Sequence, residues 1–278
     1  MAITFQASES IVRSIVNQLR KQEYVHPDAV FNHRADHDLR REITYRDEDF
    51  LYMLSKTSQE EKFIDDALEC LISNHVVLEK SDYNKQAFHE FRQEIKKKFK
   101  GTWTSITPVM ERLMYMLTSV HRPKRMVEFG CYWGNTLAWF IGPGISKYKQ
   151  FELEKVYAVD VNAEMINKAI DNFSKIEGTD CIEFLAEDAR VTIDKISEPI
   201  DFLYLEAKSD ESPELYLELL QKIYPKLSPG AWVIAHDIYD KVGKSDLVNY
   251  VRWVRDKSNF QESLAFDIDN YGMELSIK

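Results

Sequence analysis

The feature that most constrains the fold of this chain is a regular alternation of short apolar runs and amphipathic segments after residue 125. Five runs have the length and composition of buried strands: 125–129, 155–161, 181–186, 200–205 and 231–236. Each is followed by a helical pattern, and residues 263–268 and 271–277 are two further strand candidates. This order predicts an open α/β sheet that is mostly parallel, with helices on both faces and an antiparallel C-terminal edge.

The first part of the chain shows no strand pattern. Apolar residues recur at helical spacing over 11–19, 63–72 and 84–100. Pro108 suits the first turn of a further helix over 108–120. We therefore predict an all-helical N-terminal cap over residues 1–103 and a catalytic domain over residues 104–278.

Charge and composition exclude several classes of protein. Residues 126–278 carry a net charge of −11, whereas nucleic-acid binding needs a basic face, so no nucleic-acid partner is expected. No apolar run reaches the length of about 18 residues that a membrane span needs, and no secretory signal is visible at the start. The three cysteines are scattered and odd in number, which favours a cytoplasmic location.

The first strand-to-helix turn carries candidate ligand-binding residues. In open parallel sheets, ligands bind outside the carboxyl ends of the strands. Gly130 and Gly134 flank this turn, where glycines let a ligand approach the backbone. Glu128 is an unusual carboxylate on a buried strand and would attract an ammonium group. The alternative is an ordinary turn with a salt-bridged glutamate.

Acidic residues also follow the second and third strands. Asp160 could accept both hydroxyls of a ribose. Asp188 could accept an adenine amino group, with the backbone N–H of Ala189 donating beside it. Either aspartate could instead cap a helix. Tyr132 and Trp133 would crowd a pyrophosphate in the first turn, so a nucleoside without phosphate is favoured.

These segments together resemble the class I S-adenosylmethionine-dependent methyltransferases, in the form found among small-molecule O-methyltransferases. The matching segments are VEFGCYWGNT, VYAVDVN, AEDA and LSPGAWVIAHD, with Ala231 in place of a second glycine. The resemblance covers residues 104–278 and implies a Rossmann-like, seven-stranded sheet. It also implies S-adenosylmethionine as the cofactor, with Ser105, Trp133 and Asn135 near its methionine end.

The reacting groups are expected after the fourth and fifth strands, at Glu206, Lys208, His236 and Asp237. Metal-dependent relatives carry Asp at the position of Glu206 and a second acid at the position of His236. A divalent ion held by Glu206, His236 and Asp237 is therefore an alternative that we do not favour. Without a metal, His236 or Asp237 would act as a general base. Lys208 could do the same, orient an anionic acceptor, or simply pair with Glu206.

A helical cap suits the enclosure of a small substrate and the exclusion of water. We therefore predict methyl transfer from S-adenosylmethionine to an oxygen or nitrogen of a small molecule, in biosynthesis, with a homodimer left open. One alternative is an enzyme that releases methylthioadenosine, by aminocarboxypropyl transfer or by cyclisation of the cofactor. Another is a non-catalytic cofactor-binding module. The by-product distinguishes methyl transfer from the first alternative, since methyl transfer leaves S-adenosylhomocysteine and not methylthioadenosine.

Overall fold

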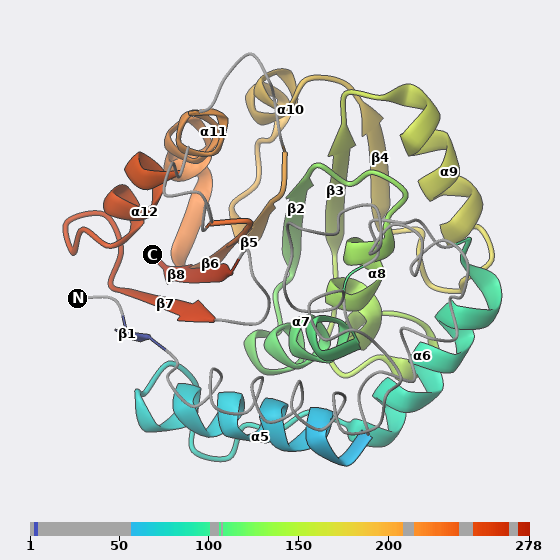
Figure 1. Ribbon diagram of the computed structural model, residues 1–278. Helices are drawn as coiled ribbons and strands as arrows, with labels where there is room; N and C mark the ends of the chain where they lie inside the picture. Colours follow the sequence, from blue (N-terminus) through green and yellow to red (C-terminus); the bar gives the residue numbers. More distant parts are fainter. Residues whose placement is uncertain are drawn as a thin grey trace, which may run out of the picture.

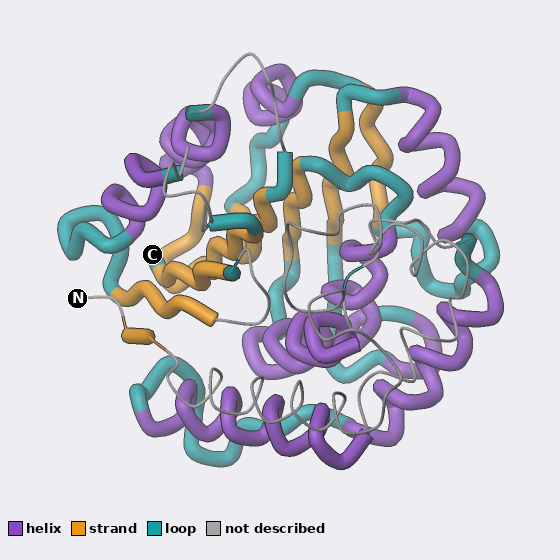
Figure 2. Tube along the Cα trace, in the orientation of Figure 1, coloured by secondary structure: helices purple, strands orange, loops and turns teal. Residues whose placement is uncertain are grey.

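A computed structural model describes residues 3–4, 57–100, 106, 108–207, 214–238, 247–266 and 272–278. Its centre is a sheet with the strand order β1-β7-β8-β6-β5-β2-β3-β4 (Figures 1 and 2). The strands are β1 (Ile3–Thr4), β2 (Arg125–Phe129), β3 (Lys155–Asp160), β4 (Ile182–Ala186), β5 (Ile200–Leu205), β6 (Leu227–His236), β7 (Glu262–Phe266) and β8 (Met273–Ile277).

Neighbouring strands are parallel except around β8, which runs antiparallel to both β6 and β7. Strands β2–β8 confirm the predicted Rossmann-like, seven-stranded sheet with its antiparallel C-terminal strand. One strand was not predicted. The two residues of β1 pair parallel with β7, so the described N-terminal part is not helical throughout. Two residues are too few to produce a detectable alternation.

Helices cover both faces of the sheet (Figure 1). The α-helices are α5 (Thr57–Ser73), α6 (Lys85–Lys98), α7 (Pro108–His121), α8 (Asn135–Ile141), α9 (Ala163–Phe173), α10 (Ala189–Lys195), α11 (Leu215–Ile223) and α12 (Val248–Val254). The short 3₁₀ helices within the described ranges are η1 (Gly142–Gly144), η2 (Ser146–Tyr148) and η3 (Tyr224–Lys226). Helices α5–α9 share one hydrophobic core with one face of the sheet, and α10–α12 share a second core with the other face.

The described part of the predicted cap packs as a layer on this domain. The helical spacing over residues 84–100 predicted a buried face, and Phe88, Phe91, Ile95 and Phe99 are all buried. The rings of Phe88 and Phe91 lie 6.2 and 5.8 Å from that of Trp139 in α8. Helices α5, α6 and α7 confirm three predicted helices, while residues 11–19 lie outside the described part.

The division at residue 103 stays a prediction, because residues 101–105 also lie outside the described part. Within the described ranges, no helix combines the length and the apolar character that crossing a membrane requires.

Candidate active site

Strand register places several functional side chains on one face of the sheet. Glu128 of β2 is in register with Tyr204 of β5, which is in register with Ile234 of β6. Glu206 and His236 each follow two positions later, at the carboxyl ends of their strands. Because alternate residues of a strand share a face, these side chains lie on the face that α7 and α8 cover. The fold therefore brings together residues that are far apart in the sequence.

The turn after β2 needs both of its glycines for reasons internal to the protein. Gly130 has φ +91°, and a Cβ there would lie 2.6 Å from the backbone oxygen of Glu206. Gly134 has φ +75°, and a Cβ there would lie 2.4 Å from the ring of Phe173. The left-handed backbone and these close approaches exclude a side chain at either position. The ends of β2 and β5 thus lie directly against each other.

Glu128 is an unsatisfied buried acid. Its residue is 2% exposed, and among the described residues neither carboxylate oxygen has a hydrogen-bond partner. Burial, together with the charges of Glu206 and Asp160, raises the pKa of Glu128 well above its usual range. The alternative of a salt-bridged glutamate is not seen in the described part of the chain. A carboxylate in this position is unfavourable unless a cation or donor joins it.

Asp160 is held by backbone amides at the end of β3. The N–H groups of Tyr132 and Asn162 each donate to its carboxylate at 2.9 Å. Asn162, not Asp160, caps α9, since its side chain accepts from the N–H of Glu164 at 3.0 Å. A carboxylate can accept about four hydrogen bonds. Asp160 therefore has acceptor capacity left for a ligand.

Asp188 matches the capping alternative. Its side chain accepts from the N–H of Arg190 at 2.8 Å at the start of α10. It also pairs with the guanidinium of Arg190 at 2.6 Å, which lowers the pKa of Asp188. Ala189 is the first residue of α10. A contact with adenine at Asp188 stays a prediction, and it would share the carboxylate with Arg190.

Trp133 packs against α9. Its indole Nε1 donates to Met165 Sδ at 2.8 Å, and the ammonium of Lys168 lies 4.5 Å from the ring centroid. Asn135 begins α8 and is half-buried. The positions of Trp133 and Asn135 near the methionine end of the cofactor stay predictions. Ser105 lies outside the described residues.

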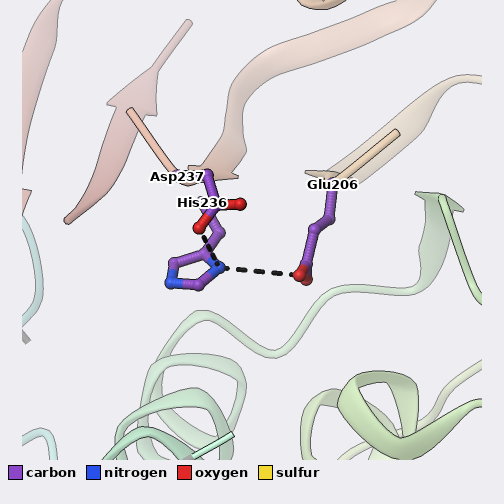
Figure 3. A group of neighbouring side chains, drawn as sticks. All are labelled: Glu206, His236 and Asp237. Atoms are coloured by element: carbon purple, nitrogen blue, oxygen red, sulfur yellow. Dashed lines mark ion pairs between the residues drawn. The ribbon is translucent and has the colours of Figure 1, made fainter. Parts of the chain in front are cut away.

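The carboxyl ends of β5 and β6 bring three predicted residues together (Figure 3). His236 Nδ1 lies 3.6 Å from Glu206 Oε1 and 3.4 Å from Asp237 Oδ1. Asp237 has φ +60°, a conformation that non-glycine residues adopt rarely and that is frequent at functional sites. Lys208, with its predicted pairing to Glu206, lies outside the described residues.

The same three side chains are candidate metal ligands. Their candidate ligand atoms all lie within 4.8 Å of one another. They supply one imidazole nitrogen and two carboxylates, a mixed set that matches Mg²⁺ less well than an all-oxygen site does. The second oxygen of Glu206 already accepts a hydrogen bond from Tyr204 at 2.5 Å. These residues fit Mg²⁺ poorly.

Tyr204 is the residue of this site that the sequence analysis missed. It lies inside the apolar run IDFLYL, which predicted only a buried strand. The available signal was its position two residues before Glu206, which places both side chains on the same face. A polar tip on an otherwise apolar face usually has a partner when it is buried.

The sheet order, the glycine turn after β2 and the acid that ends β3 define a class I methyltransferase fold. Residues 127–238 match the family described as a methyltransferase domain. The predicted resemblance to the class I, S-adenosylmethionine-dependent methyltransferases is confirmed over this part of the chain.

Solved structures agree in fold. The S-adenosylhomocysteine-bound methyltransferase PaMTH1 from Podospora anserina is 15% identical with a TM-score of 0.53, covering 76% of this chain and 94% of that one. The O-methyltransferase TomG from Streptomyces achromogenes, solved with S-adenosylmethionine, is 12% identical with a TM-score of 0.50, covering 72% and 92%. No curated protein matches the chain. At these identities the likeness shows the fold alone.

Proposed function

We propose that this domain transfers the methyl group of S-adenosylmethionine to an oxygen or nitrogen of a small molecule. The observation that carries the proposal is the buried carboxylate of Glu128, which has no hydrogen-bond partner among the described residues and lies two positions before the turn residue Gly130. The ammonium of the cofactor would supply the cation that Glu128 lacks. The ribose diol would take the remaining acceptor capacity of Asp160 on the neighbouring strand.

The surroundings of Asp160 support an adenosine. Val161 follows it directly and is 73% exposed, which leaves an apolar surface beside the proposed ribose position. Helix α10, which begins at Ala189, packs near β3. An adenine between these elements would cover apolar surface, with the N–H of Ala189 as a donor to its ring.

The reaction is an in-line displacement. The acceptor atom forms a bond to the methyl carbon, the sulfur–methyl bond breaks, and its electron pair stays on sulfur to give S-adenosylhomocysteine. The proton of the acceptor goes to His236 Nε2, because Glu206 and Asp237 face the other ring nitrogen and orient the imidazole. Positioning of the two reactants supplies most of the rate.

The acceptor is a small molecule without strong negative charge. Glu206 and Asp237 flank the proposed base, and residues 126–278 carry a net charge of −11. A helical cap suits a small biosynthetic substrate better than a macromolecule. The three cysteines are free, which supports a reducing, cytoplasmic compartment.

Calorimetric titration with S-adenosylmethionine tests the cofactor site. Asp160→Ala should weaken binding by about 1–3 kcal/mol, because the ribose hydroxyls lose their acceptor. Glu183→Gln is the matched control, since that carboxylate lies on β4 in an exposed pair with Lys155. Wild-type affinity in Asp160→Ala would remove Asp160 from the site, and no binding by the wild type would refute the proposal.

A further inference from the structure

Tyr204 is a buried tyrosine with a fixed position. The residue is 1% exposed, and its ring lies 4.9 Å from that of Phe140 in α8. It is held in the ladder between Glu128 and Ile234. A ring packed between a strand and a helix has little rotational freedom. Its hydroxyl therefore reaches one defined point at the carboxyl end of β5.

That hydroxyl is a hydrogen-bond donor to the active site. It donates to Glu206 Oε2 at 2.5 Å. Burial, and then the charge of Glu206, raises the pKa of Tyr204 well above its usual range, so the phenol stays protonated. A short bond from a phenol to a carboxylate is among the stronger hydrogen bonds in proteins.

Glu206 needs such a restraint. Its side chain is 30% exposed, and a partly exposed glutamate side chain without a fixed partner ordinarily samples several rotamers. With Oε2 bonded to Tyr204, the other oxygen is the one that faces His236 Nδ1. The three side chains form a row that runs from the core to the proposed base.

We propose that Tyr204 is a positioning residue, whose hydroxyl fixes Glu206 so that Glu206 in turn orients the imidazole of His236. The contact needs neither cofactor nor acceptor. Its consequence for catalysis rests on the proposed function.

The test is long-range ¹H–¹⁵N NMR of the histidine side chains in the full-length, ¹⁵N-labelled protein at one pH, without cofactor. The signals of His236 are assigned with His236→Gln. Tyr204→Phe removes one oxygen from the chain and should shift the His236 nitrogen signals, because Glu206 is released. Tyr250→Phe is the matched control, since it removes a buried hydroxyl that has no hydrogen-bond partner among the described residues.

A second variant covers the case in which Tyr204→Phe does not fold. Glu206→Asp keeps the charge but is too short to span from the phenol to the imidazole, so it should move the same His236 signals. Unchanged His236 signals in a folded Tyr204→Phe protein would overturn the proposal, as would unchanged signals in Glu206→Asp. Because the spectra are recorded without ligand, the result for Tyr204 does not depend on whether the protein binds S-adenosylmethionine.

Discussion

At the scale of single residues, Glu128 links the stability of the protein to pH. Its pKa in the folded protein is raised above the value of 4.5 expected in the unfolded chain. Protonation of Glu128 therefore favours the fold. This contribution is complete below pH 4.5 and is lost as the pH rises through the raised pKa.

Replacement of this carboxylate should show the effect directly. Without cofactor, Glu128→Gln and the wild type should have the same free energy of unfolding near pH 4. As the pH rises, the variant should become more stable than the wild type by about 1 kcal/mol per pH unit, until the raised pKa is passed. Thermal unfolding at several pH values measures the difference. A difference that does not change with pH would mean that Glu128 is not buried as a raised-pKa acid.

Asp237 allows binding and turnover to be separated. Asparagine tolerates the left-handed backbone that position 237 requires, so Asp237→Asn should keep the fold. The substitution removes one of the two charges facing His236 and should lower turnover tenfold or more, while S-adenosylmethionine affinity stays near that of the wild type. Initial rates and calorimetry on the same preparation measure both. Unaltered turnover would exclude a role for Asp237 in the reaction.

At the scale of helices and strands, a buried ionic network ties the cap to the rest of the domain. The guanidinium of Arg112 in α7 pairs with Glu60 in α5, and both are fully or almost fully buried. Arg92 in α6 pairs with Glu60 at 2.8 Å and with Glu111 at 3.0 Å. The guanidinium carbons of Arg92 and Arg112 lie 4.3 and 4.4 Å from the centroid of the Phe88 ring. Three helices are thus joined around one aromatic ring.

Removal of Arg112 should be costly, because it takes one of two guanidinium partners from the buried Glu60 and leaves a cavity where a fully buried side chain stood. Arg112→Ala should lower the free energy of unfolding by about 3–5 kcal/mol. Lys62→Ala on α5 is the control, since the ammonium that pairs with Asp66 is exposed to solvent and its loss should change the free energy of unfolding little. Denaturant unfolding of both variants measures the two changes in the free energy of unfolding. Equal small effects would show that the network does not hold the cap helices in place.

Elements with strong periodicity were predictable from sequence. The strands β2–β8 were predicted from the length and composition of their apolar runs, and the buried face of α6 from its helical spacing. The two-residue strand β1 was not predictable, because its pairing depends on an edge formed by residues far along the chain. Asp188 was ambiguous for another reason: a side chain that caps a helix and one that binds a ligand have the same sequence signature.

At the scale of the whole molecule, the sheet register determines which distant residues meet. Glu206 and His236 were identified from their positions at strand ends, and the structure places His236 Nδ1 3.6 Å from Glu206 Oε1. Their link to Tyr204 was missed, because the two-residue spacing places Tyr204 and Glu206 on one face but does not show that the hydroxyl and the carboxylate meet. The same packing places the cap layer and the candidate catalytic residues on one side of the sheet.

The central claim is methyl transfer, and the by-product of S-adenosylmethionine tests it most directly. The purified full-length protein is incubated with the cofactor and a panel of small alcohols, phenols and amines, and the mixture is read by mass spectrometry, with Asp160→Ala as the control. Methyl transfer predicts S-adenosylhomocysteine together with an acceptor heavier by one methyl group, and neither product in the control. Methylthioadenosine above the control level would contradict methyl transfer and would show that the enzyme acts on the aminocarboxypropyl chain of the cofactor.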